Sequence, residues 1–101
     1  MERTNTNTGT ITDEEYCRIC GYGDGGLIWE NGWPTAVICP CCGTESGIGD
    51  MGDPGTWEGL RGIRDYRGYW VGNGARWHSP TLRPKEWDLL AQLADIPTVW
   101  R

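Results

Sequence analysis

Five cysteines are the residues of this chain whose type and spacing can do chemistry. The stretch VICPCCGTESG, residues 37–47, holds three of them, and CRICG holds the other two. Cys17 pairs with Cys20, and Cys39 with Cys42, in two CxxCG motifs. In such a turn the backbone amides point at the second sulfur, and the glycine that follows permits a positive φ. Four thiolates from two such turns suit tetrahedral Zn²⁺ in a structural site.

The segment between the two motifs is long enough to form a hairpin that brings them together. We therefore predict one Zn²⁺ per chain, bound by Cys17, Cys20, Cys39 and Cys42, with iron as the less favoured metal. The alternative is that these residues are buried or redox-active free thiols.

Cys41 is a surplus thiol inside the second motif, and three interpretations are open. It is a bystander pointing away from the metal, an alternate ligand that exchanges with Cys39 or Cys42, or a reactive cysteine beside a cation. We favour the bystander, because a ligand pair that includes Cys41 would leave too few residues for a chelate turn. His78 is the only histidine. It is either a fifth ligand or base, or an ordinary residue at a helix entry.

Length and composition predict one small domain that needs a stabilising cross-link in addition to its apolar core. The 101 residues include sixteen glycines, seven tryptophans, four tyrosines and no phenylalanine, which make a poor aliphatic core. Residues 1–13 are polar and predicted to be flexible, which leaves 14–101 as a single zinc-ribbon domain. Neither a charged-then-apolar leader nor an apolar run of about 20 residues is visible, so we expect a cytoplasmic protein without membrane contact. In that reducing compartment clustered cysteines are expected to hold metal.

The segment between the motifs predicts a hairpin. Two apolar patches, LIW and AVI, are separated by ENGWPT. In that stretch Asn31 with Gly32 favours the primed turn that matches strand twist. The second patch is expected to lead into Cys39 as a short strand. Trp29 and Trp33 are interpreted as core or hairpin-packing residues, and the alternative is that one of them serves a partner surface.

Two helices are predicted after the second motif. The first spans about 56–72, with Thr56 as the N-cap and GNG as the stop. Its recurring apolar residues are Trp57, Leu60, Ile63, Tyr66 and Trp70. The second spans about 84–95, with Pro84 at its first position and Pro97 beyond its end. The expected fold class is small α+β: a rubredoxin-like zinc ribbon, made of two knuckles and a β-hairpin, with two packed α-helices.

Arg67 falls within the apolar arc of the first predicted helix, and Arg61 and Arg64 flank that arc. Two interpretations are open. Either the Arg67 stem lies over a tryptophan with its guanidinium paired to a carboxylate, or Arg67 anchors a partner.

Four stretches carry a resemblance to a known family: ICPCCG, the approach NGWPTAVICPCCG, GNGARWHSP and the closing RPKEWDLLAQL. Together they resemble the small bacterial cysteine-rich CPCC proteins over roughly residues 16–96. The resemblance implies a fold around a rubredoxin-like zinc ribbon. Some members are encoded near bacterial toxin systems, so an immunity or accessory role is also implied. The chain departs from the family after Gly43, where it has TESGIGD.

The sequence favours a non-enzymatic protein-binding module. Catalysis would need a nucleophile with a base or an open metal position, whereas four thiolates close the metal and His78 has no visible partner. Nucleic-acid binding is the first alternative, and it would depend on Arg61, Arg64, Arg67 and Arg76. It is disfavoured because residues 1–50 carry eight acidic and two basic residues, against six and seven in residues 51–101.

A rubredoxin-like iron electron carrier is the second alternative, since YCRICGY is similar to the start of a rubredoxin. Zinc has no redox chemistry, so the identity of the metal separates a scaffold from a carrier. For the acidic ribbon half we expect a protein partner, such as a basic toxin. The sequence makes no prediction of oligomeric state.

Overall fold

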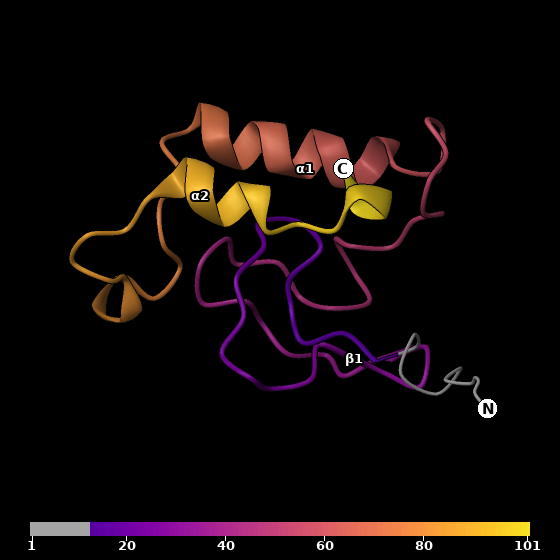
Figure 1. Cartoon of the computed structure of the whole chain (residues 1–101), viewed down its shortest axis with the longest axis horizontal. Coiled ribbons are helices and arrows are strands. Elements are labelled where there is room, and N and C mark those ends of the chain that lie inside the picture. The colour runs from indigo at the N-terminus through magenta and orange to yellow at the C-terminus, as the bar shows by residue number, and fades with distance from the viewer. Residues whose placement is uncertain (1–12) are drawn as a thin grey trace.

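The two α-helices lie on one side of the molecule, above the loops of the N-terminal part of the described chain (Figure 1). Helix α1 (Arg61–Gly72) runs along the top of this view, and α2 (Leu89–Ala94) lies beneath it. Two short 3-10 helices, η2 (Pro80–Leu82) and η3 (Thr98–Trp100), lie before and after α2 in the chain. The computed structural model describes residues 13–101. The predicted flexible segment therefore lies outside the described residues, except for Asp13.

The predicted hairpin is present, and its turn is the expected one. Strand β1 (Trp29–Glu30) pairs antiparallel with β2 (Trp33–Pro34), and the two residues that flank the turn face each other. Asn31 has a φ of 53° and Gly32 a φ of 79°. A type I′ turn needs positive φ at both positions. Trp29 is buried, whereas Trp33 is 75% exposed.

The strand predicted to lead into Cys39 is reduced to a single bridge. Ile38 pairs with Glu45 in an isolated antiparallel bridge, and Ala36 just before it has a φ of 64°. A left-handed residue interrupts an extended segment, so the ladder cannot continue from β2 into the second cysteine turn. On the other edge of the hairpin Glu14 bridges to Trp29.

Helix α1 begins at Arg61, and the predicted start at residue 56 is wrong. The Thr56 hydroxyl does accept a hydrogen bond from the Gly59 amide, at 3.0 Å, as an N-cap would. However, the Gly59 carbonyl accepts the Asp53 amide at 3.0 Å, which binds this turn to the preceding loop. The chain therefore makes turns before it becomes helical.

The apolar arc of α1 is shorter than the sequence pattern suggested. Leu60, Ile63 and Trp70 are buried and Tyr66 is partly buried. Trp57 is 74% exposed, because it belongs to the turns before the helix rather than to its apolar face. The prediction of an apolar arc is confirmed from Leu60 to Trp70 and is wrong for Trp57.

Helix α2 is also shorter than predicted, running from Leu89 rather than residue 84. Its N-cap is Asp88, whose carboxylate accepts a hydrogen bond from the Ala91 amide at 3.1 Å. Asp88 is extended, with a φ of −116° and a ψ of 106°, so helical geometry cannot reach back to Pro84. No helix among residues 13–101 is both long and apolar enough to cross a membrane.

Sulfur and aromatic side chains dominate the core. All five cysteines are buried, together with the tryptophans at positions 29, 70, 77 and 100 and the isoleucines at positions 19, 63 and 96. This composition agrees with the expectation that the chain has too few aliphatic residues to build an ordinary core. The two cysteine turns are part of this core cluster.

Candidate metal centre

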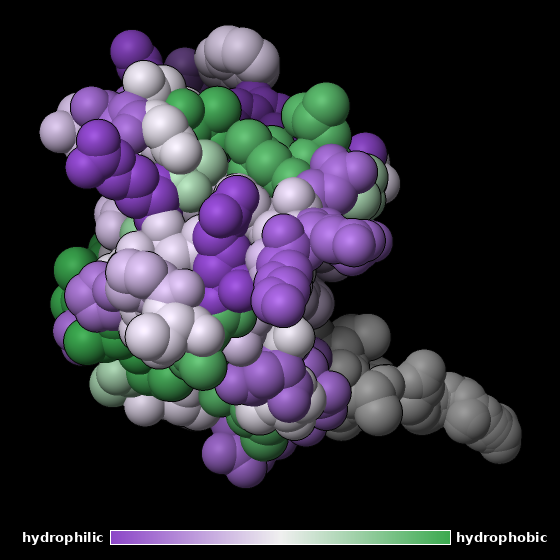
Figure 2. Space-filling view, turned by 90° about the vertical axis from the view of Figure 1, so that its left-hand side faces the viewer, coloured by the Kyte–Doolittle hydropathy of each residue, from purple (hydrophilic) through white to green (hydrophobic). Residues whose placement is uncertain are grey.

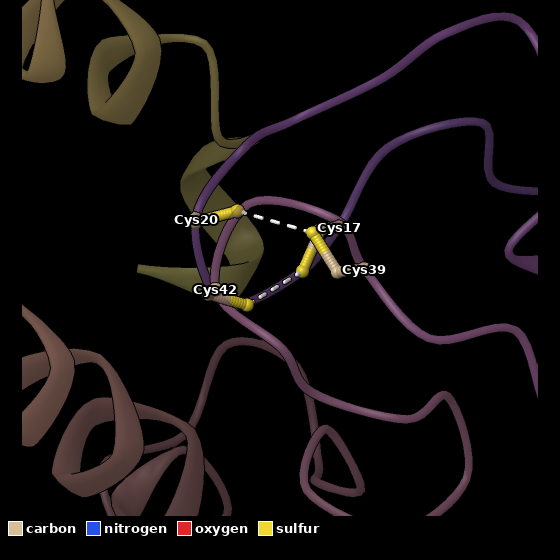
Figure 3. A group of neighbouring side chains, drawn as sticks. All are labelled: Cys17, Cys20, Cys39 and Cys42. Atoms are coloured by element: carbon tan, nitrogen blue, oxygen red, sulfur yellow. Dashed lines mark hydrogen bonds between the residues drawn. The ribbon is translucent and has the colours of Figure 1, made fainter. Parts of the chain in front are cut away.

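The two CxxCG turns bring four sulfur atoms into one buried group (Figure 3). The Sγ atoms of Cys17, Cys20, Cys39 and Cys42 all lie within 4.8 Å of one another. Cys17 Sγ lies 3.6 Å from Cys42 Sγ, and Cys20 Sγ lies 3.6 Å from Cys39 Sγ. These are the four residues that the sequence predicted as ligands.

The two turns have the same backbone hydrogen bonds, which explains why the sulfurs converge. In each turn the backbone N–H of the first cysteine donates to the carbonyl of the residue five positions later. The backbone N–H of the glycine donates to the carbonyl of the first cysteine. The bonds are Cys17 to Tyr22, 2.8 Å; Cys39 to Thr44, 2.8 Å; Gly21 to Cys17, 2.8 Å; and Gly43 to Cys39, 2.9 Å. Gly21 has a φ of 85° and Gly43 a φ of 82°. The predicted need for glycine after each second cysteine is confirmed.

The sulfur group fits a tetrahedral metal ion. A tetrahedron with Zn–S bonds of about 2.3 Å has sulfurs about 3.8 Å apart, and the separations here lie around that value. The four residues are at most 8% exposed. All four positions of such an ion would be filled by protein, which describes a closed structural site.

The close sulfur contacts shift the pKa values of Cys20, Cys39 and Cys42 in opposite directions. Contact with Cys17 lowers the pKa of Cys39, whereas the pKa values of Cys20 and Cys42 are raised, first of all by their own contact with Cys17. Four adjacent thiolates would repel one another in a desolvated pocket. A divalent cation removes that repulsion, because metal binding holds every ligand in its deprotonated form.

Cys41 lies outside the four-sulfur group and is fully buried. Its Sγ accepts a hydrogen bond from the Gln92 side-chain amide at 3.3 Å, and its carbonyl accepts the His78 amide at 2.9 Å. Contact with Cys20 lowers the pKa of the Cys41 thiol, and the Gln92 donor acts in the same direction. The favoured interpretation of Cys41 as a thiol apart from the ligand set agrees with this placement.

His78 is exposed and does not join the sulfur group. Its ring packs beside Gly43, where an added Cβ would lie 3.3 Å from Nδ1. Among the described residues, the side chains close enough together to share a metal ion are the four cysteines alone. The structure therefore gives His78 a position beside the second turn rather than a place in the metal site.

Arg67 holds the first cysteine turn against the helices, and the predicted pairing of its guanidinium with a carboxylate is wrong. Its Nε donates to the Ile19 carbonyl at 2.7 Å, and its Nη2 donates to the carbonyls of Arg18 and Trp100, both at 2.8 Å. Burial lowers the pKa of Arg67 from its ordinary value. The residue cross-links three segments through backbone oxygens instead of pairing with a carboxylate.

Helix α2 also contacts the first cysteine turn, through Gln92. The Gln92 side-chain amide donates to the Cys20 carbonyl at 3.0 Å, and the Trp87 indole donates to the Gln92 side-chain oxygen at 2.8 Å. Gly21 lies so near α2 that an added Cβ would be 2.4 Å from the Gln92 carbonyl oxygen. The sequence analysis missed Gln92, because nothing in the helix pattern distinguishes a glutamine that faces a turn from one that faces solvent.

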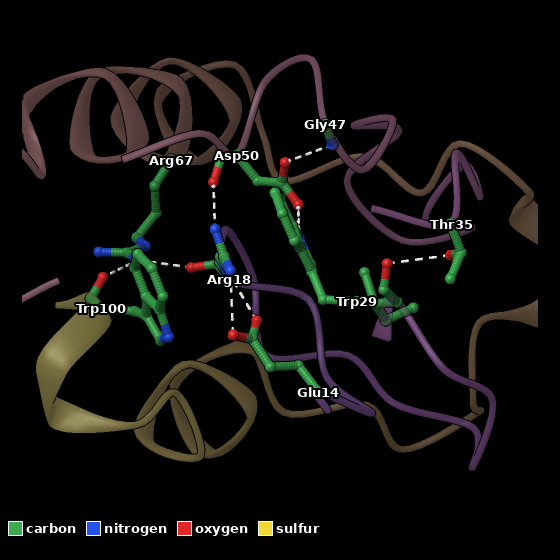
Figure 4. Close-up of polar contacts among 9 residues, drawn as sticks. Glu14, Arg18, Trp29, Thr35, Gly47, Asp50, Arg67 and Trp100 are labelled. Carbon is green, nitrogen blue, oxygen red and sulfur yellow. Dashed lines mark hydrogen bonds and ion pairs between the residues drawn. The ribbon is translucent and has the colours of Figure 1, made fainter. Parts of the chain in front are cut away.

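A second missed feature is the buried ion pair beside the metal turns (Figure 4). Arg18 donates from Nε and Nη2 to the two carboxylate oxygens of Glu14, at 2.7 and 3.0 Å. Its guanidinium carbon lies 3.8 Å from the ring centres of both Trp29 and Trp100. Cation–π contact and a bidentate carboxylate together compensate a buried charge. Arg18 is the residue after Cys17, at a variable position of the CxxC motif. The motif therefore does not predict that the Arg18 side chain is buried.

Comparisons with protein-family models, with curated proteins and with solved structures find no match to this chain. The resemblance to the CPCC proteins therefore depends on the quoted motifs alone.

Proposed function

We propose that this protein is a zinc-stabilised, non-enzymatic module that binds another protein. The observation that carries the proposal is the group of four buried sulfurs, mutually within 4.8 Å. A metal ion held by four thiolates at a site with so little exposure has no position left for substrate or water. Its role is then to stabilise the fold.

Zinc is the proposed ion, and iron in an electron carrier is the competing one. Metal analysis of the protein purified from its natural host tests this directly. We expect about one zinc per chain, a colourless solution, and unfolding when a strong chelator removes the metal, since structural zinc contributes on the order of 10 kcal/mol in small modules. A coloured protein that bleaches on reduction would support the iron carrier and overturn this part of the proposal.

Exposed apolar side chains support a protein partner. Trp33 and Ile48 are 75% and 74% exposed within residues 13–50, a segment that carries seven acidic residues and one basic residue. Exposed aromatic and aliphatic side chains among acidic residues suit a basic protein surface. A basic toxin is a partner that would suit this acidic segment, and the CPCC resemblance implies an immunity or accessory role in a toxin system.

The nucleic-acid alternative loses support from the arginines on α1. The Arg67 guanidinium and the Arg64 Nε donate to backbone carbonyls, so they are engaged within the fold. Affinity capture from host lysate with the zinc-loaded chain, followed by mass spectrometry, tests the protein-binding proposal. We expect a specific basic protein whose capture survives nuclease treatment. Capture of nucleic acid alone would instead support the alternative.

A further inference from the structure

A pocket of about 550 Å³ lies where α2 meets the first cysteine turn. Figure 2 shows the end of the molecule at which α2 begins, where purple hydrophilic side chains stand beside green apolar surface. The aromatic and acidic side chains that line the pocket are Tyr22, Trp77, Trp87, Glu86, Asp88 and Asp95. The proposed metal site does not use these side chains.

Three aromatic rings form the apolar part of the pocket. Tyr22 and Trp87 stand nearly perpendicular to Trp77, with interplanar angles of 88° and 83° and ring centres 5.5 and 5.4 Å from it. Trp77 is buried, whereas the other two rings are partly exposed. Trp77 therefore forms the base of the pocket, and the two flanking rings offer aromatic surface to a ligand.

Carboxylates form the polar part of the pocket. Glu86, Asp88 and Asp95 line it, and no Lys or Arg of the described part of the chain is among the lining residues. Within residues 13–101 none of these three carboxylates has a Lys or Arg ion-pair partner. Asp88 uses one oxygen to cap α2, which leaves its other oxygen and both neighbouring carboxylates available.

A second pocket, of about 450 Å³, shares Trp77 and Trp87 with the first and has the reverse charge. Among residues 13–101 its charged lining residues are Arg76 and Arg83, and the Arg83 guanidinium carbon lies 5.3 Å from the Trp87 ring centre. A further cation is therefore favoured in the pocket lined by carboxylates rather than in this one.

We propose that the acidic aromatic pocket binds a Lys or Arg side chain presented by a protein partner. The aliphatic stem would pack on the exposed indole and phenol surface, and the charged head would lie among the carboxylates. An acidic or neutral side chain lacks this complementarity. The inference rests on the proposed function and adds the chemical class of the anchor that the partner supplies.

The pocket also explains what the metal contributes to recognition. Gly21 and Tyr22 line it and directly follow Cys20, and Gln92, another lining residue, donates to the Cys20 carbonyl at 3.0 Å. Fixing Cys20 on a metal ion therefore fixes one wall of the pocket. A preformed wall lowers the ordering cost of binding. Ligand binding is then expected to require zinc although no ligand atom touches it.

The test uses the zinc-loaded full chain and a short peptide of alternating glycine and lysine. Indole Nε1–H signals in nitrogen-edited NMR spectra report the tryptophans one by one. We expect saturable shifts for Trp77 and Trp87, and no shifts when the lysines are acetylated or replaced by glutamate. The absence of shifts with the lysine peptide, or equal shifts with the acetylated one, would overturn the proposal.

Matched charge variants separate a specific pocket from general attraction to an acidic protein. Glu86→Gln with Asp95→Asn removes two exposed carboxylates of the pocket, and Glu30→Gln with Asp53→Asn removes two exposed ones elsewhere. We expect about tenfold weaker peptide binding for the first pair and under about twofold for the second. Equal losses for both pairs would contradict the pocket.

Failure of this inference is distinguishable from failure of the proposed function. If the pocket variant binds zinc and still captures the natural partner with wild-type affinity, the module stands and the pocket is not its anchor site. If the purified chain holds no zinc, the metal proposal fails whatever the peptide does.

Discussion

The side-chain amide of Gln92 donates a hydrogen bond to the Cys41 sulfur at 3.3 Å, from a helix 51 residues further along the chain. The same amide reaches the Cys20 carbonyl at 3.0 Å. One side chain thus contacts both a surplus thiol and the turn that presents a ligand. Cys41 has a packing role in this arrangement, and it is not a member of the four-sulfur group that contains Cys39 and Cys42.

Cys41→Ser is expected to retain full zinc content, because its sulfur is not among the four that converge. A hydroxyl at the same place can still accept from Gln92, so the free energy of unfolding should fall by only about 1 kcal/mol. Cys20→Ser should lose the metal and unfold. Zinc analysis with urea unfolding of both variants measures the contrast. A Cys41→Ser protein without zinc would show that the ligand set is wrong.

Arg67→Ala is expected to destabilise the protein by roughly 3 kcal/mol, because the guanidinium donates to three backbone carbonyls and such charged bonds contribute about 1.5–3 kcal/mol each before solvent screening. Urea unfolding in excess zinc measures this loss of unfolding free energy. Arg67→Lys should recover less than half of the lost stability, since one ammonium group cannot reproduce the planar set of N–H donors of a guanidinium.

The matched control is Arg61→Ala, which removes an exposed arginine with an ion pair to Glu58 at 4.0 Å. Its effect should stay within about 0.5 kcal/mol. If Arg67→Ala left stability unchanged and weakened only partner binding, Arg67 would be the partner anchor that the sequence analysis allowed.

The local parts of the fold could be predicted, because each depends on neighbouring residues. The positive φ values at Gly21 and Gly43 follow from the CxxCG motif, and the hairpin turn follows from Asn31 and Gly32. The buried arc of α1 follows from helical periodicity. The four cysteines that cluster could be predicted from their two local CxxCG motifs.

The remaining features depend on contacts between distant segments. The start of α1 is shifted by the bond from Asp53 to Gly59, and the burial of Arg18 requires Trp100, far along the chain. No periodicity encodes either contact. The aromatic pocket likewise joins Tyr22 to Trp77 and Trp87, and only the folded chain shows that the three rings meet.

Asp50→Asn is expected to lower the free energy of unfolding by about 2–3 kcal/mol. Asp50 is fully buried, and its two oxygens accept the Trp29 indole at 2.9 Å and the Gly47 amide at 2.7 Å. An asparagine amide group offers a donor in place of one acceptor, so one of the two N–H groups would lose its partner. Thermal unfolding in zinc measures the change. The exposed Asp53→Asn serves as control and should be nearly neutral; equal effects would contradict the network in Figure 4.

Gly21→Ala tests whether α2 is seated on the first cysteine turn. The residue has a φ of 85°, and an added Cβ would lie 2.4 Å from the Gln92 carbonyl oxygen. An alanine in the left-handed conformation alone costs about 1–2 kcal/mol. Because the new methyl group would also overlap the Gln92 carbonyl, the loss of unfolding free energy should exceed that value. Denaturant unfolding of zinc-loaded variants gives the numbers, and the Trp87 indole signal should move because its acceptor is the Gln92 side chain.

Two alanine variants isolate the contributions to the Gly21 effect. Gly25 has a φ of 94° with no described atom within 4 Å of an added Cβ, so Gly25→Ala should show the backbone cost alone. Gly62 on α1 has ordinary φ and equally open space, so Gly62→Ala should stabilise by up to about 1 kcal/mol. A Gly21→Ala loss no larger than that of Gly25→Ala would mean that α2 moves away from the turn at no cost. The pocket wall, and with it the proposed dependence of cation binding on zinc, would then lack its structural basis.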